Sequence, residues 1–110
     1  MNASPYRYEG PEGLRGPIEQ ALRRVVDPEV ALTIVDVGLV YDVVVTAACL
    51  RVTMTMTSAA CPVADLILAE VEAELDHVAP PGVPVDVCLV WEPPWTPERM
   101  SPRAKAFMGW

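Results

Sequence analysis

The chain has 110 residues, of which 52% are hydrophobic and 21% charged, so it can form one hydrophobic core and does not have the composition of a disordered segment. Its formal net charge is −7 and its eight Lys and Arg residues are scattered, which excludes the basic surface that nucleic-acid binding needs. Every apolar run ends well before the roughly 20 residues of a membrane span, and the amino terminus lacks a signal-peptide pattern. We therefore expect a cytoplasmic domain without nucleic-acid or membrane partners.

The first predicted elements are a flexible tail and a helix. Residues 1–16 contain three Gly and two Pro among polar residues, a composition that buries too little apolar surface to offset the entropy of ordering. From Pro17 to about Val26 the apolar residues have helical spacing, at Ile18, Ala21, Leu22 and Val25. The sequence thus predicts a flexible tail over residues 1–16 and an ordered domain over residues 17–110 that opens with a helix.

Strands and helices then alternate along the chain. Residues 41–45 and 50–56 alternate apolar and polar side chains and predict a hairpin, although Ala47 and Ala48 between them are poor turn residues. Residues 62–77 have helical periodicity, residues 83–91 alternate again, and Ser101 followed by Pro102 is typical of a helix start.

The order α-β-β-α-β-α predicts an α/β (α+β) fold in which helices cover one face of a three-stranded mixed sheet. Since the third strand follows a helical crossover, it should lie parallel to its neighbour, with a right-handed connection.

Three cysteines are present, an odd number at wide spacings, which fits neither a secreted disulfide framework nor a paired CxxC metal site. Cys61 is predicted at a strand-to-helix junction with Pro62 at the first helical position, and helix amino termini lower the pKa of a thiol. Asp65 opposes that effect, and a purely packing role for Cys61 stays open at this point. Cys49 and Cys88 are expected to be packing residues, and His77 a solvated one.

Two carboxylate segments flank predicted elements: Asp27–Pro28–Glu29 after the first helix, and Asp36–Val37–Gly38 before the first strand. Pro28 restricts the residue before it, and Gly38 can adopt a backbone conformation that other residues avoid. From the residues alone, capping of the neighbouring backbone is the favoured interpretation of both segments.

These segments resemble, in order and spacing, the motifs of the SufT/PaaD-type family of metal–sulfur cluster biosynthesis. The matching stretches are Asp-Pro-Glu at 27–29, Ile-Val-Asp-Val-Gly-Leu-Val-Tyr at 34–41, Thr-Met-Thr-Ser-Ala-Ala-Cys-Pro at 55–62, Pro-Pro-Trp-Thr-Pro at 93–97 and Met-Ser at 100–101. The resemblance extends from about Pro17 to Gly109. Ala31 departs from it, because members commonly have Pro there, and so does the pair Ala59–Ala60 before the cysteine.

The resemblance implies an assembly domain in which these motifs gather around one pocket. Cys61 would be the ligand of a metal or cluster, and the pocket would be formed by Asp27, Glu29, Asp36, Gly38, Thr57 and Pro62. Iron or an iron–sulfur cluster would be bound transiently, because a cluster usually takes about four protein ligands and this chain offers one activated cysteine.

The function that follows is an accessory factor, not an enzyme, in iron–sulfur cluster assembly or delivery. Its partners would be assembly scaffold or recipient proteins, and a homodimer is one way to complete the ligand set. Alternatives are a PaaD-like accessory protein of a phenylacetyl-CoA oxygenase system, a thiol enzyme with Cys61 as nucleophile, and a pure interaction module. A carboxyl-terminal end without further cysteines favours general maturation over the PaaD branch.

Overall fold

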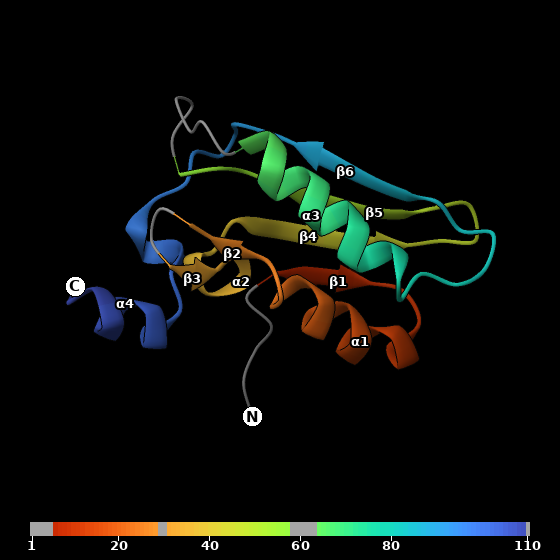
Figure 1. Ribbon diagram of the computed structural model, residues 1–110, viewed down its shortest axis with the longest axis horizontal. Helices are drawn as coiled ribbons and strands as arrows, with labels where there is room; N and C mark the ends of the chain where they lie inside the picture. The colour runs from red at the N-terminus through yellow and green to blue at the C-terminus, as the bar shows by residue number, and fades with distance from the viewer. Residues whose placement is uncertain (1–5, 29–30, 58–63, 110) are drawn as a thin grey trace.

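The computed structural model describes residues 6–28, 31–57 and 64–109. Within them the main sheet has four strands in the order β1-β4-β5-β6 (Figure 1). The strands are β1 (Arg7–Glu9), β4 (Val40–Val45), β5 (Leu50–Met54) and β6 (Val85–Leu89). The predicted hairpin is confirmed as the antiparallel pair β4–β5, and the predicted parallel pairing of the last strand is confirmed as β5–β6.

The predicted count of three strands is wrong, because β1 adds a fourth strand parallel to β4. This strand lies inside the segment predicted to be a flexible tail. Its anchor is Tyr6, which is only 5% exposed, and Tyr8 also packs against the core. The alternation of two tyrosines with Arg7 and Glu9 is a strand signal. Because the strand has only three residues, the Gly- and Pro-rich composition around it outweighs this signal and predicts a flexible tail instead.

The first helix, α1 (Glu12–Leu22), begins five residues before the predicted start, so Pro17 lies inside it. Leu14 packs against the core and extends the apolar stripe one turn toward the amino terminus, which is why the helix begins earlier. It also ends earlier, because Val26 enters the short strand β2 and the carbonyl of Val25 accepts a hydrogen bond from the amide of Ile34 at 3.0 Å.

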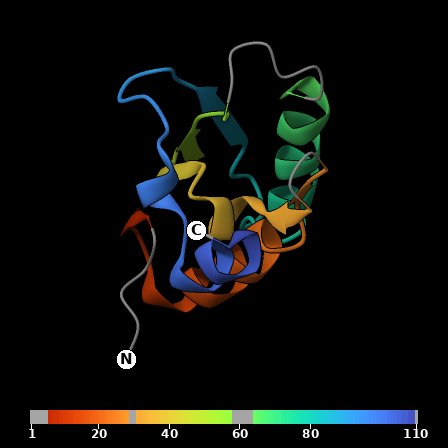
Figure 2. The ribbon, with the colours of Figure 1, turned by 90° about the vertical axis from the view of Figure 1, so that its left-hand side faces the viewer.

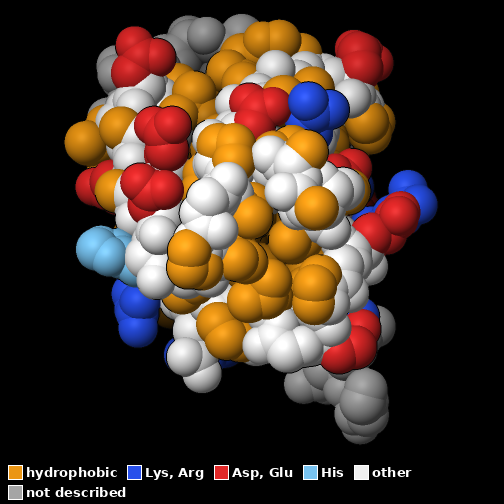
Figure 3. All heavy atoms as spheres, turned by 90° about the vertical axis from the view of Figure 1, so that its right-hand side faces the viewer, with side chains coloured by type: hydrophobic (Ala, Val, Ile, Leu, Met, Phe, Trp, Pro, Cys, Tyr) orange, Lys and Arg blue, Asp and Glu red, His pale blue; other side chains and the backbone are white. Residues whose placement is uncertain are grey.

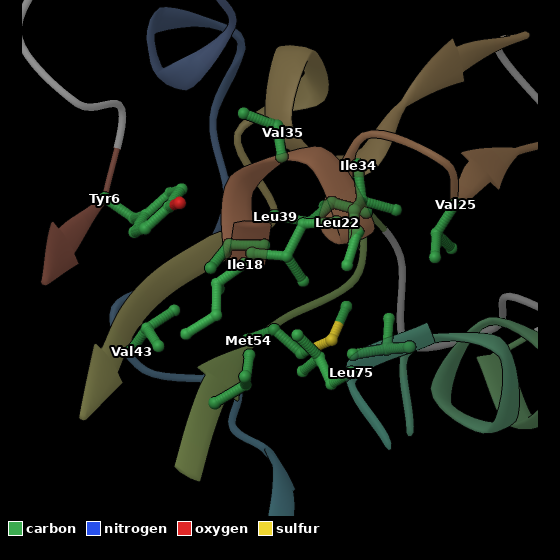
Figure 4. Close-up of a cluster of buried hydrophobic side chains, with 14 of the residues drawn as sticks. Tyr6, Ile18, Leu22, Val25, Ile34, Val35, Leu39, Val43, Met54 and Leu75 are labelled. Carbon is green, nitrogen blue, oxygen red and sulfur yellow. The ribbon is translucent and has the colours of Figure 1, made fainter. Parts of the chain in front are cut away.

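Both α1 and α3 (Ala64–Asp76) lie on one face of the main sheet (Figure 2). The core between them contains Leu50, Val52 and Met54 of β5, whereas Arg51 on the opposite face is exposed. Figure 4 shows side chains from α1, β4, β5 and α3 converging in this core. Residues 64–76 confirm the described part of the helix predicted over 62–77, because Ile67, Val71 and Leu75 repeat on its buried face.

The remaining elements are short and surround one end of the main sheet. Strands β2 (Val26–Asp27) and β3 (Leu32–Thr33) form a second, two-stranded antiparallel sheet, and α2 (Ile34–Val37), the 3-10 helix η1 (Pro97–Arg99) and α4 (Pro102–Met108) complete the fold. The predicted helix start at Ser101 is confirmed, since its Oγ accepts a hydrogen bond from the amide of Ala104 at 3.1 Å. No helix within the described ranges is long and apolar enough to cross a bilayer.

Candidate functional site

The candidate site lies at the end of the main sheet where β4 begins and β5 and β6 end. Here the amide of Thr55 donates to the carbonyl of Leu39 at 2.8 Å, and the amide of Val90 donates to the carbonyl of Met54 at 2.8 Å. The described chain stops just beyond this point at half-buried Thr57 and resumes at α3. The predicted ligand Cys61 and its neighbour Pro62 therefore lie outside the described residues, as does Glu29.

Asp36 is buried in α2 and its carboxylate contacts three other parts of the chain. Its Oδ1 accepts hydrogen bonds from the Ser101 hydroxyl at 3.1 Å and from Arg23 Nη1 at 3.4 Å, while the Thr33 hydroxyl donates to Oδ2 at 3.1 Å. The amide of Ser101 also donates to the Asp36 carbonyl at 2.8 Å. Asp36 thus connects α1, the start of α2 and the start of α4.

Residues 93–101, which we call the C-terminal segment, lie against residues 36–41 and form hydrogen bonds with them. The indole Nε1 of Trp95 donates to the carbonyl of Val37 at 2.7 Å, and Nε of Arg99 donates to the carbonyl of Gly38 at 3.3 Å. The Arg99 guanidinium lies 4.0 Å from the ring centroid of Tyr41, whose hydroxyl donates to the carbonyl of Pro93. Two of the family-like motifs, 34–41 and 93–97, are therefore in contact.

The lack of a side chain at Gly38 allows the C-terminal segment to lie this close to the end of α2. Its φ of 86° is in the left-handed region, which residues other than glycine avoid, and Gly38 ends α2. A Cβ placed on Gly38 would lie 2.2 Å from the carbonyl oxygen of Arg99, so a side chain here would push the C-terminal segment away.

Asp27 is brought into the same region by the small sheet. Asp27 is only 1% exposed. It pairs with Leu32 on the neighbouring strand β3, and the next residue on that strand, Thr33, caps α2. Between the two strands Ala31 has a φ of 60°, and its amide donates to the Asp27 carbonyl at 2.8 Å. Because a proline ring holds φ near −65°, the Pro common in the resembled family could not adopt this conformation.

The structure places Asp36 and Gly38 just before Leu39, which pairs with the end of β5, and it places Asp27 on the neighbouring strand β2. The other candidates lie elsewhere. Cys88 lies on the open face of the sheet, with its Sγ 3.9 Å from an Asp86 carboxylate oxygen, and the amide of Cys49 donates to the Thr46 hydroxyl in the β4–β5 turn. Both thiols are free, and His77 follows α3 at the surface. In the part of the chain that the structure describes, no three His, Cys, Asp or Glu side chains are placed to hold a metal.

Arg23, Thr33 and Arg99 also belong to this region, although they were not among the residues predicted from the sequence. The pair Thr33 and Asp36 carried a usable signal, because Ser or Thr followed three residues later by an acidic residue is typical of a helix start. No local signal existed for Arg23, which reaches Asp36 from 13 residues away in sequence.

Comparisons with known proteins identify the family of the chain. A family model described as iron–sulfur cluster assembly protein matches residues 16–87. The Fe-S protein maturation auxiliary factor YitW of Bacillus subtilis is 44% identical over 99 residues, covering 89% of this chain and 96% of the relative. The Fe-S protein maturation auxiliary factor SufT of Staphylococcus aureus is 41% identical, covering 77% of this chain and 97% of the relative.

The fold is also similar to a crystal structure of a domain of unknown function from Bacillus anthracis. The TM-score is 0.80 with 41% sequence identity, and the match covers 89% of this chain and 93% of that one. The residues matched by the family model include the motifs at 27–29, 34–41 and 55–62, and the curated relatives and this solved structure match most of the chain. The chain therefore belongs to the SufT-type family of iron–sulfur cluster assembly proteins.

Proposed function

We propose that this protein is an auxiliary factor in the maturation of iron–sulfur proteins, acting in the assembly or delivery of clusters. The observation that supports the proposal is that relatives named as such factors match 77–89% of this chain and 88–97% of their own length, at 44% identity in one case. Its partners would be cluster assembly scaffolds or the recipient proteins themselves.

Cys61 is the proposed ligand of the cluster, which is the cargo of the protein. It lies in the segment between the end of β5 and the start of α3, whose described flanks are at the same sheet end as Gly38 and Asp36. A cluster usually needs about four ligands, so a partner protein or a second copy would supply the others. A cargo held by one thiolate of this chain is readily passed on, which suits delivery.

We assign different roles to the carboxylates around it. Both oxygens of Asp36 accept hydrogen bonds from neighbouring side chains, so Asp36 is proposed to shape the site instead of binding metal, as is Gly38. Asp27, Glu29, Thr57 and Pro62 would then line the pocket beside Cys61.

The experiment is anaerobic reconstitution with ferrous iron and sulfide, followed by visible absorption and light scattering. Cys61→Ser should lose the cluster absorption and fail to complement a deletion strain, while its circular dichroism stays that of the wild type. Cys49→Ser is the matched control, because this half-buried thiol lies in the β4–β5 turn at the opposite end of the main sheet from the candidate site, and it should retain both properties.

Light scattering in the same samples distinguishes the two sources of the missing ligands. A mass that doubles with cluster loading indicates a second copy, whereas a constant mass without cluster absorption indicates that a partner protein must supply the other ligands. Full complementation by Cys61→Ser at wild-type expression would contradict the assigned role of the thiol.

A further inference from the structure

The outer edge of the main sheet at β6 carries backbone groups with no partner in the part of the chain that the structure describes. The amide of Leu50 donates to the carbonyl of Pro84, and the amide of Val90 donates to the carbonyl of Met54. The backbone N–H and C=O groups of the even-numbered residues along this strand therefore point toward β5. Successive residues in a strand point their N–H and C=O groups to opposite sides. Those of Val85, Val87 and Leu89 therefore point outward, and no described group hydrogen-bonds to them.

The two edges of this sheet differ in how far they block strand addition. At the other edge β1 has three residues, two of which, Arg7 and Glu9, are charged, and Gly10 and Pro11 follow directly. Short length, charge and proline are the usual means by which natural sheets prevent edge pairing. The β6 edge has five residues and one charge, Asp86, which already forms an ion pair with Arg51 at 3.1 Å.

On the face of the sheet that α3 covers, the side chains of β6 are apolar, and the charged side chains of α3 itself are acidic. Val85, Val87 and Leu89 are half-buried against the core on the α3 side of the sheet. All charged residues of α3 are acidic, and Figure 3 shows Asp and Glu side chains along the side of the molecule on which α3 lies. They are Asp65, Glu70, Glu72, Glu74 and Asp76, of which Glu74 lies near Arg24, its Oε1 3.5 Å from Nη1.

We propose that the β6 edge is a docking site for an extended segment of a partner protein that carries Lys or Arg and adds to the sheet as a fifth strand. Main-chain hydrogen bonds to Val85, Val87 and Leu89 would supply affinity, and the acidic α3 would select basic side chains. The inference deepens the proposed function, on which it rests for the kind of partner, an assembly scaffold or recipient protein.

Charge favours such a partner over a second copy of this chain. Pairing β6 with β6 of another copy would place two acidic α3 helices on the same face of one continuous sheet, and each molecule has a net charge of −7. Like charges brought together in this way oppose association, whereas a basic segment is attracted.

The test uses the full, nitrogen-15-labelled chain without iron and capped nine-residue peptides in which Val alternates with Lys or, as a matched control, with Glu. Binding of the Lys peptide should slow amide exchange at Val85, Val87 and Leu89 by about tenfold or more and leave Tyr8 in β1 unchanged. The Lys peptide should bind at least about tenfold more tightly than the Glu peptide, with a difference that shrinks in high salt.

Two further Lys peptides, N-methylated on one or the other set of alternate residues, test the strand geometry without altering the protein. Because a strand uses every second amide toward each neighbour, one of the two should bind and the other should not. On the protein, Val87→Pro removes an outward N–H while the bonds to β5 remain, and it should weaken binding if it folds. Glu70→Gln combined with Glu72→Gln should weaken binding of the Lys peptide only.

Equal binding of the Lys and Glu peptides, or of the two methylated peptides, would overturn the proposal. So would slow exchange at Val85, Val87 and Leu89 that appears without peptide and grows with protein concentration, because the occupant would then be a second copy. Cluster loading plays no part in these measurements, so their failure is separate from a failure of the Cys61 experiment.

Discussion

Gly38 and Gly82 have similar backbone conformations, with φ of 86° and 80°, but different surroundings. A Cβ at Gly38 would meet the Arg99 carbonyl at 2.2 Å, whereas at Gly82 no heavy atom lies within 4 Å. Gly82→Ala should therefore lower the free energy of unfolding by about 1–2 kcal/mol, the cost of a left-handed alanine. Gly38→Ala should cost about 1–3 kcal/mol more, because the C-terminal segment must also move.

Urea unfolding of both variants measures this difference, and the shared φ makes Gly82→Ala the control for backbone strain. Equal losses would mean that the C-terminal segment moves aside freely. Its contact with Gly38 would then not hold the site together.

At the scale of elements, replacing each of two tryptophans with phenylalanine tests how the C-terminal segment is attached. Trp95→Phe removes the donor to the Val37 carbonyl and leaves that acceptor without its 2.7 Å hydrogen bond, which should lower the free energy of unfolding by about 1–3 kcal/mol. Trp91 is 43% exposed, so Trp91→Phe should change it by no more than about 0.5 kcal/mol. Urea unfolding compares the two, and a larger loss for Trp91→Phe would show that the segment is held elsewhere.

At the scale of the whole molecule, the net charge of −7 predicts how stability responds to salt. Raising NaCl from about 0.01 M to about 0.15 M shortens the screening length from about 30 Å to about 8 Å, which weakens the self-repulsion of the folded chain. The ion pairs that salt also weakens, such as Arg51–Asp86, are largely exposed and contribute little. Tm should therefore rise across this range.

The control for this prediction is the double variant Glu70→Lys and Glu72→Lys. Each substitution changes the charge by +2, so the net charge becomes −7 + 4 = −3. The rise of Tm with salt should then be smaller. A fall of Tm in the wild-type protein would show that attractive pairs outweigh the net repulsion.

The sequence by itself determined the elements whose signals are long and local. The alternation of residues 50–56, the helical stripe from Ile67 to Leu75 and the Ser101–Pro102 helix start each predicted an element that the structure confirms. The helical crossover predicted a parallel last pair, and the order of the motifs predicted the family. The role of Cys61, which lies outside the described residues, stays a prediction.

Only the tertiary structure decided which parts of the chain meet. Strand β1 is three residues long and is stabilised by pairing with β4, more than 30 positions away, so its own sequence contains little of the information that forms it. Asp36 accepts a hydrogen bond from Ser101, which is 65 residues away in sequence. A side chain at position 38 would collide with Arg99, so glycine is required there. Periodicity and capping depend on neighbours within one or two turns, whereas these contacts depend on the complete arrangement of the chain around one core.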